Sequence, residues 1–295
     1  MTPAISLAGV LLAVWALFGA QPGSAAVPTG YVAAAIAAAD RPPEQVARDA
    51  ERRPEAVLTF AGVKPGDRVA DFMSGGGYFT RLFSHIVGNS GHVYAFLPEE
   101  QLRNCSPDEV AGTRALEHGV YSNVSVLTAP VGRFRLPEPV DLVWTSLNFH
   151  DLYDSFMGSA NVSQVARAMF EALKPGGELM VIDHVAEAGS GIRDTETLHR
   201  IDPEVIVRTA LAAGFRLEAE SDLLRNPQDS HRLRVFDAAV RGRTDQVILK
   251  FRKPASASAP PRSDGASARG DGGVRPWPPV RGLMPLKSPQ PVSDS

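Results

Sequence analysis

The 295-residue sequence contains one cysteine, Cys105, which excludes an intramolecular disulfide and a cysteine-based metal cluster. It has no excess of basic residues, since 30 Lys and Arg stand against 33 Asp and Glu, a net charge of −3. A nucleic-acid partner calls for a clustered basic surface, which this balance does not favour. The seven histidines show no ligand spacing with acids on one face of an element, so the sequence predicts no metal site.

Charged side chains are missing before Asp40, and residues 5–20, ISLAGVLLAVWALFGA, form an unbroken apolar run. The run is short for a membrane span and close to the length of a signal-peptide core. Small residues at Ser24 and Ala26 fit cleavage after Ala26, although no Lys or Arg precedes the run. We therefore expect residues 1–26 to be an export signal, giving a periplasmic protein without a stable membrane span in the mature chain. The alternative is a cytoplasmic protein with an apolar N-terminal helix or a misassigned start.

Proline, serine, glycine and alanine dominate residues 254–295. Such a segment cannot bury enough apolar surface to offset its chain entropy, so it is expected to be a disordered tail. One folded domain is therefore expected over about residues 40–253.

Strand-like and helix-like segments alternate through this domain. The expected strands are 64–73, 91–96, 123–129, 140–147, 178–184, 215–221 and 245–251. The expected helices are 41–62, kinked or split at Pro54, and 77–87, 107–118, 161–173 and 203–213. This alternation predicts an α/β protein with a doubly wound sheet. The long connection 223–244 is expected to be a solvated helix, and a substrate lid is the alternative.

A glycine loop, Ser74-Gly75-Gly76-Gly77, follows the first expected strand. In a doubly wound sheet, ligands bind beyond the carboxyl ends of the strands, where the strand order reverses. A dinucleotide-binding loop needs G-x-G-x-x-G, and Thr80 stands at the third glycine position. S-adenosyl-L-methionine (SAM) is the alternative cofactor, with Asp71 at the strand end placed to meet its amino group.

Three segments, VKPGDRVADFMSGGGYFTRL, VDLVWTSLNFHDLY and ALKPGGELMVIDH, resemble the first, fourth and fifth-strand motifs of class I SAM-dependent methyltransferases. They occur in the same order and at similar spacings, and the resemblance covers about residues 55–253. More narrowly, the chain is similar to bacterial predicted methyltransferases of unassigned substrate. The resemblance implies a Rossmann-like, doubly wound, seven-stranded sheet that is mostly parallel with an antiparallel last strand.

The resemblance also implies a cofactor site at Asp71, Ser74, Gly75, Gly76, Gly77 and Asn148. Two positions depart from the family pattern. Met73 replaces the first glycine of the common loop, and Leu97 stands where the family has an acid for the ribose hydroxyls. Glu99 is close enough to reach back to the ribose, whereas the other interpretation makes it an acid at a helix N-terminus.

Beyond the fourth strand lies Asn148-Phe149-His150-Asp151. This segment resembles that of plant small-molecule O-methyltransferases, where the catalytic base is a histidine followed by aspartate. The likeness implies that His150 is a general base oriented by Asp151. Tyr153, close by in the sequence, and His184, at the end of the fifth strand, are the candidate substrate contacts. The favoured alternative for His184 is a strand-end histidine whose hydrogen bonds are satisfied within the protein. The other interpretation is that His150 and Asp151 are purely structural.

The sequence therefore predicts an enzyme, a SAM-dependent methyltransferase, that methylates a small molecule at oxygen. The competing prediction is a non-catalytic SAM-fold binding protein, and a dehydrogenase is disfavoured by Thr80. The sequence leaves the methyl acceptor and the oligomeric state open.

Overall fold

The computed structural model describes residues 30–104, 106–117, 121–158 and 160–255. The expected export signal, residues 1–26, lies outside the described residues, as does the expected tail apart from Pro254 and Ala255. Export and periplasmic location therefore stay predictions. Among the described residues, no helix combines the length and apolar character needed to cross a membrane.

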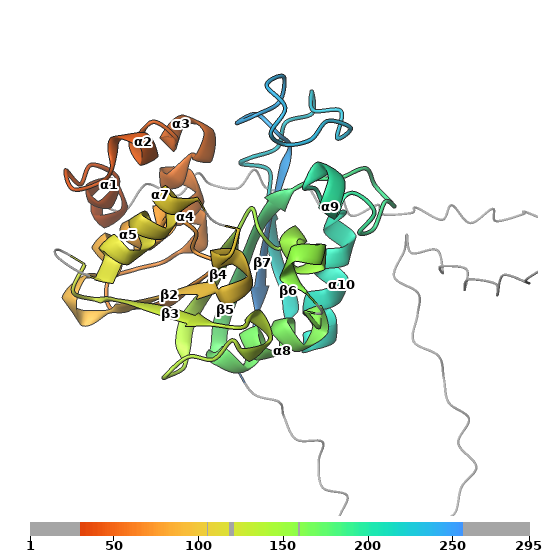
Figure 1. The fold of residues 1–295 in the computed structure, drawn as a ribbon. Coiled ribbons are helices and arrows are strands. Elements are labelled where there is room, and N and C mark those ends of the chain that lie inside the picture. Colours follow the sequence, from red (N-terminus) through yellow and green to blue (C-terminus); the bar gives the residue numbers. More distant parts are fainter. Residues whose placement is uncertain (1–29, 105, 118–120, 159, 256–295) are drawn as a thin grey trace, which may run out of the picture. The chain divides into compact units, whose positions relative to one another are not determined.

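Seven strands form one sheet in the order β3-β2-β1-β4-β5-β7-β6 (Figure 1). The strands are β1 (Arg68–Phe72), β2 (His92–Pro98), β3 (Val124–Ala129), β4 (Val140–Ser146), β5 (Leu173–His184), β6 (Arg216–Ser221) and β7 (Gln246–Arg252). β7 runs antiparallel to β5 and β6, and the pairs among β1 to β5 are parallel. The predicted sheet is confirmed, with its reversal point between β1 and β4.

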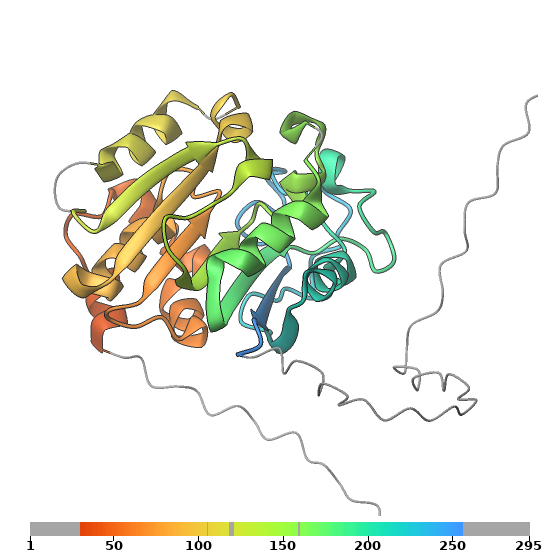
Figure 2. The same cartoon turned by 90° about the horizontal axis from the view of Figure 1, so that it is seen from below.

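Helices cover both faces of this sheet (Figure 2). The α-helices are α1 (Gly30–Ile36), α2 (Pro43–Val46), α3 (Asp49–Arg52), α4 (Pro54–Ala61), α5 (Tyr78–Val87), α6 (Glu99–Leu102), α7 (Pro107–Arg114), α8 (Val162–Ala172), α9 (Thr195–Leu198) and α10 (Pro203–Ala213). Short 3₁₀ turns are η1 (Gly88–Ser90), η2 (Ala115–Glu117), η3 (Val131–Arg133), η4 (His150–Tyr153) and η5 (Ser155–Met157).

The core has two parts, one on each face of the sheet. One contains the fully buried Trp144 of β4 with Phe79 and Phe83 of α5, at ring-centroid distances of 4.6 and 5.2 Å. The other contains residues of α8 and α10, including Met169 and Ile206. Because both faces of β4 are covered, its sequence reads as a nearly continuous apolar run, as expected for a central parallel strand.

The N-terminal boundary of the domain differs from the expected residue 40. Val32 and Ala35 of α1 are buried in the same core cluster as residues of α5. The domain therefore includes α1, which lies before residue 40. The expected helix 41–62 is divided into α2, α3 and α4. Arg53 adopts left-handed backbone, φ 45°, immediately before Pro54, which ends α3 and starts α4.

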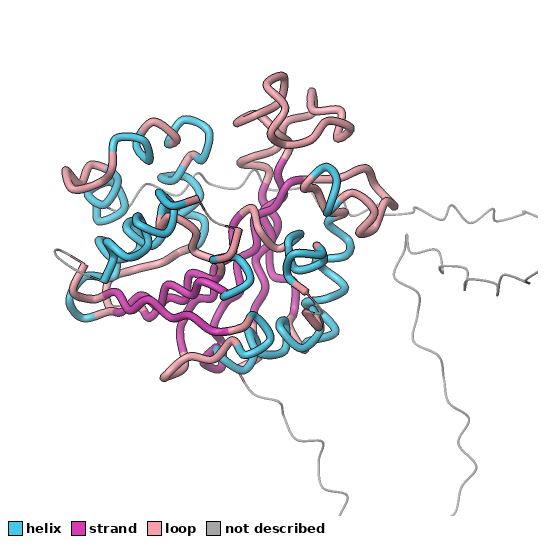
Figure 3. The backbone as a smooth tube through the Cα atoms, in the orientation of Figure 1, coloured by secondary structure: helices cyan, strands magenta, loops and turns pink. Residues whose placement is uncertain are grey.

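The connection between β6 and β7 corrects the expectation of a solvated helix. Residues 222–245 form a series of turns, drawn in pink in Figure 3. An ion pair between Arg200 and Asp229 fixes this loop, with Nη1–Oδ2 at 2.8 Å and both side chains fully buried. Arg200 also donates to the carbonyls of Leu233 and Val185, at 2.9 and 3.0 Å. This loop is therefore ordered by buried polar contacts and not by the hydrogen bonds of a helix.

Replacing Asp229 with alanine should leave the Arg200 guanidinium buried without its carboxylate. Removing one partner of a buried ion pair destabilises a protein by about 3–5 kcal/mol. Denaturant unfolding should report this loss. The matched control is Glu171→Ala, which breaks an exposed pair with Arg167 and should cost less than about 1 kcal/mol. Equal stability of the two variants would contradict a structural role for the buried pair.

Candidate functional site

The glycine loop turns directly after β1 through left-handed backbone. Met73, Gly75 and Gly77 have φ angles of 59°, 52° and 76°. Such backbone costs a non-glycine residue about 1–2 kcal/mol, and Met73, which is 2% exposed, offsets this by packing in the core. The Ser74 N–H donates to the Phe96 carbonyl at 3.1 Å and ties the loop to β2. Met73 therefore makes the bend itself, without the glycine of the common loop.

Asn148 joins the loop to the segment that follows β4. Its side-chain amide donates to the Met73 carbonyl at 2.8 Å, and the Thr145 hydroxyl donates to its carbonyl oxygen. Leu147, immediately before it, also has left-handed backbone, with φ 61°. One side chain thus connects the carboxyl ends of β1 and β4, the two strands at the reversal point.

Asp71 points into the same region and is 4% exposed. Burial raises the pKa of its carboxyl to about 7, against the hydrogen bond from Thr80 and the charge of Arg52, which lower it. The Thr80 hydroxyl donates to Asp71 at 2.6 Å. A cationic ligand beside Asp71 would favour the ionised carboxylate, because an opposite charge stabilises it.

A cavity of about 540 Å³, here called the loop cavity, lies against the glycine loop. Its wall includes Asp71, Ser74, Gly75, Gly76 and Asn148, whereas Gly77 caps α5 and is outside this lining. Four buried atoms on the wall have no hydrogen-bond partner among the described residues: Ser74 Oγ, Arg52 Nε, Gln45 Oε1 and Gln101 Oε1. Because buried polar atoms in proteins are nearly always paired, these four suit a polar ligand.

Glu99 does not occupy the position expected for a ribose-binding acid. It is exposed at the first residue of α6 and is not among the residues that line the loop cavity. Its neighbour Glu100 accepts a hydrogen bond from the Val131 N–H at 3.0 Å. Gln101 lines the cavity instead, so the polar contribution of α6 comes from an amide.

A second cavity of about 840 Å³, here called the histidine cavity, adjoins the first. Its polar wall contains His150, Asp151, His184 and His199, and its apolar wall contains Phe156, Val235 and Phe236. Five residues line both cavities: Arg48, Arg52, Gln101, Leu147 and Asp151. The two cavities therefore meet beside the carboxyl ends of the central strands.

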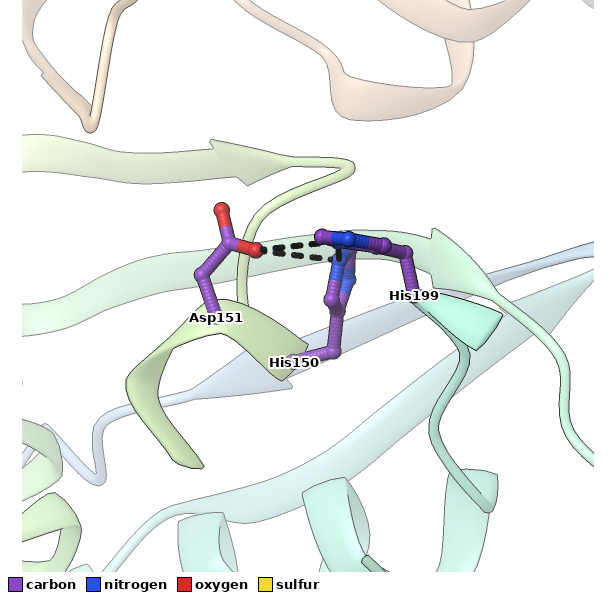
Figure 4. Close-up of side chains that lie close together, drawn as sticks. All are labelled: His150, Asp151 and His199. Carbon is purple, nitrogen blue, oxygen red and sulfur yellow. Dashed lines mark hydrogen bonds and ion pairs between the residues drawn. The ribbon is translucent and has the colours of Figure 1, made fainter. Parts of the chain in front are cut away.

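His150, Asp151 and His199 converge on the wall of the histidine cavity (Figure 4). His150 Nε2 lies 3.1 Å from Asp151 Oδ1 and 3.3 Å from His199 Nδ1. His199 Nδ1 is 3.7 Å from Asp151 Oδ1. We call these three residues the His–Asp–His cluster. His199, at the C-terminal end of α9, was absent from the sequence prediction.

Asp183, at the end of β5, orients His150 from the other side. One carboxylate oxygen is 2.7 Å from His150 Nδ1, and the other accepts the His150 backbone N–H at 2.8 Å. Burial disfavours the imidazolium, but the charges of Asp183 and Asp151 outweigh it and hold the pKa of His150 well above 6.5. The imidazolium form of His150 is therefore favoured in this arrangement. This corrects the expectation of a neutral base with an ordinary pKa.

The two predicted substrate contacts have different outcomes. His184 lines the histidine cavity, and burial with the nearby charge of His150 holds its pKa well below 6.5, so it is neutral. Tyr153 is not among the lining residues of either cavity. Its hydroxyl is 3.1 Å from the Thr209 hydroxyl on α10, and Phe156 takes its place in the cavity wall.

Arg52 is a site residue that sequence reasoning missed. It lines both cavities, and its guanidinium lies 4.6 Å from the centre of the Tyr78 ring. Burial and the charge of Arg48 together lower its pKa to about 10, so it remains a cation at neutral pH. The only sequence signal was the run of charged residues in 48–53, before α4, and helical periodicity does not assign a function to such a run.

Comparison with known proteins adds sequence and fold likenesses, and no family model matches the chain. The ubiquinone/menaquinone biosynthesis C-methyltransferase UbiE of Vibrio parahaemolyticus is 27% identical over 177 residues. That alignment covers 59% of this chain and 64% of the relative, so the chain spans just under two thirds of the relative's length.

One solved structure shares the fold at low sequence identity. The cyclase SpnF superposes with a TM-score of 0.50 and 20% identity, covering 74% of this chain and 85% of its own. A SAM-dependent methyltransferase from Aquifex aeolicus has a TM-score of 0.48 and 18% identity, with coverages of 72% and 94%. The sequence relatives and the strand order confirm the resemblance to class I SAM-dependent methyltransferases.

The raised pKa of His150 predicts a pH-dependent contribution to stability. A histidine with a folded pKa above its unfolded value stabilises the fold fully below the unfolded value, 6.5. This contribution is lost as pH rises through the folded pKa. In chelator-treated protein, the free energy of unfolding should fall more steeply for wild type than for His150→Gln as pH rises above about 6.5. Parallel pH curves for the two proteins would contradict the charged state of His150.

Proposed function

We propose that this chain, which has the fold and sequence likeness of class I SAM-dependent methyltransferases, transfers a methyl group from SAM to a small hydroxyl-bearing acceptor. The observation that carries the proposal is the pair of adjoining cavities. One is lined by the glycine loop and Asp71, and the other by the His–Asp–His cluster. SAM occupies the first and the acceptor the second, so the methyl group passes between them beside Leu147 and Asp151.

The loop cavity has groups that complement SAM. Asp71 suits the amino group and Arg52 suits the carboxylate, because each offers the opposite charge. The open space beside Gly75 allows close approach of the ligand. Gln101 offers an unpaired amide oxygen to the ribose hydroxyls in place of the usual acid. SAM supplies the electrophilic methyl group, and these residues hold and orient it.

The histidine cavity suits a flat acceptor with a hydroxyl group. Phe156, Val235 and Phe236 provide apolar surface, while His184 and the His–Asp–His cluster provide hydrogen-bonding groups. Removal of the hydroxyl proton at the cluster makes the acceptor oxygen more nucleophilic. The proton passes to Asp151 or His199 of the cluster rather than to His150, because contacts with two carboxylates hold the pKa of His150 above its ordinary value.

Methylation at oxygen follows from the sequence prediction, and methylation at carbon is the second candidate. The relatives' printed names, which specify a C-methyltransferase, favour carbon. A phenolate is nucleophilic at its oxygen and at ring carbons conjugated with it, so the same deprotonation prepares either position. The same class of acceptor therefore suits both reactions. The orientation of its ring relative to the methyl group of SAM decides whether oxygen or carbon is methylated.

SAM binding should be lost in Gly75→Val. A valine side chain would point into the loop cavity, where the added Cβ meets nothing within 4 Å and the ligand is placed. Isothermal titration with SAM, and with NAD for the dehydrogenase alternative, measures this directly. Gly62→Val is the matched control, because Gly62 has similar left-handed backbone, φ 75°, open space around its Cβ and no place in this cavity. Unchanged SAM affinity in folded Gly75→Val would refute the placement.

Catalysis should appear in a screen of phenols, quinols and small hydroxy acids with SAM carrying an isotopically labelled methyl group. The labelled methyl resonance distinguishes transfer to oxygen from transfer to carbon. His150→Gln should keep SAM affinity, since the cofactor is held elsewhere, and lower turnover by about 10²–10⁴-fold. Wild-type turnover in this variant would contradict a role of the cluster. SAM binding without transfer to any acceptor class would favour the non-catalytic alternative.

A further inference from the structure

The three facing atoms of the His–Asp–His cluster have the spacing of ligands around one metal ion. His150 Nε2, Asp151 Oδ1 and His199 Nδ1 are separated by 3.1, 3.3 and 3.7 Å. The point equidistant from the three lies about 2.0 Å from each atom, which matches metal–nitrogen and metal–oxygen bond lengths near 2.0–2.2 Å. In Figure 4 the three side chains point toward one another from two separate segments of the chain.

We propose that His150, Asp151 and His199 bind a divalent first-row transition-metal ion, such as zinc or iron, on the wall of the histidine cavity. Two imidazoles and one carboxylate are the donor set that such ions prefer, whereas magnesium and calcium prefer oxygen ligands alone. Three protein ligands leave further coordination positions free, as in catalytic rather than structural metal sites.

The surroundings of His150 have the form of a supported metal ligand. Metal-binding histidines usually direct their second ring nitrogen to a carboxylate, which fixes the tautomer and the orientation of the ring. Asp183 occupies this position, 2.7 Å from His150 Nδ1, and its side chain is fully buried. Asp183 also accepts the backbone N–H groups of His150 and His184, both at 2.8 Å, so its carboxylate is itself held in place.

Backbone segments on different elements hold the other two ligands. Asp151 follows His150 in η4, and its carboxylate also lines both cavities. His199 is the C-cap of α9, and the next residue, Arg200, is anchored by its buried pair with Asp229. The cluster is therefore assembled by the fold before any ion binds, which lowers the ordering cost of binding.

One contact on the far side of His199 must change on metal binding. Arg234 Nη2 lies 3.2 Å from His199 Nε2, and a guanidinium can only donate. With the ion on Nδ1, a neutral His199 carries its proton on Nε2. The Arg234 guanidinium and His199 Nε2 would then both be hydrogen-bond donors facing each other. Arg234 is exposed, and its side chain can turn away without disturbing the core. This contact is therefore compatible with the metal-bound form.

Metal binding gives the histidine cavity a way to activate a hydroxyl group. An ion at this position lowers the pKa of a hydroxyl oxygen that it binds, which makes that oxygen more nucleophilic. This consequence rests on the proposed methyl transfer, whereas binding of the ion does not. The ion would sit on the Nε2 side of His150, which faces Asp151, while Nδ1 would keep its hydrogen bond to Asp183.

Cobalt(II) titration of the chelator-treated full chain tests the site, because bound cobalt has visible absorption bands. Wild type should bind one ion per chain at the cluster, zinc should displace it, and magnesium should not. His199→Ala should weaken binding by about 100-fold. Because His199 is partly exposed, this variant should keep its circular dichroism spectrum and its SAM affinity. Asp183→Asn should weaken binding by about 10–100-fold through the orientation of His150.

The control is His85→Ala, which removes a histidine that pairs with Asp40 outside both cavities and should bind cobalt as wild type does. Equal cobalt affinity in wild type and His199→Ala would place the ion elsewhere and overturn the proposal, as would the absence of cobalt bands in wild type. The titration uses neither SAM nor acceptor. Failure of the metal site and failure of methyl transfer are therefore separate results.

Discussion

The buried carboxylate of Asp183 is the contact on which the geometry of the histidine cavity depends. It accepts two hydrogen bonds from His150, one from the ring and one from the backbone, and a third from the His184 backbone. A buried carboxylate is expensive to desolvate, and three charge-favouring contacts offset that penalty. By binding the segment after β4 to the end of β5, Asp183 fixes the direction of His150 and with it the position of the cluster.

The part of the histidine cavity that the loop 222–245 forms depends on a different pair of buried charges. Arg200 and Asp229 form a fully buried ion pair, and the Val235 N–H donates to the Leu198 carbonyl at 3.1 Å. These contacts order the loop 222–245, which contributes Val235 and Phe236 to the cavity wall. Because the buried ion pair holds this loop in place, not all of its apolar side chains are needed for packing, and one remains free to contact a ligand. Phe236, 54% exposed, is this side chain.

The fold could be predicted almost entirely from the sequence because local signals agree with the tertiary arrangement. Glycine and proline mark the turns, and strands such as 140–147 are apolar throughout, as a central parallel strand requires. The loop 222–245 was misread as a helix because its order comes from Asp229 and Arg200. Those residues are distant in sequence from their partners, and pairing of that kind has no local period.

The site was predictable where it lies at the ends of central strands and unpredictable where distant loops complete it. The glycine loop and the resemblance to known methyltransferases pointed to Asp71, Ser74–Gly76, Asn148 and His150, and these residues line the two cavities. His199 and Arg52 were missed because α9 and α3 reach the cavities through tertiary packing. Glu99 and Tyr153 were chosen by proximity in sequence, and a shift of two or three residues along a turn moved each outside the lining, in favour of Gln101 and Phe156.

The charge distribution around the two cavities bears on the direction of the proposed reaction. Asp71 and Asp151 line the loop cavity, and Asp151 also lies where the two cavities meet. In the proposed complex Asp151 would attract the positive sulfonium of SAM, while Asp71 would meet its amino group. Methyl transfer converts the sulfonium to a neutral thioether, so the product loses this attraction while keeping its contacts at Arg52 and the glycine loop. Asp151 would therefore favour binding of the cofactor over retention of the product.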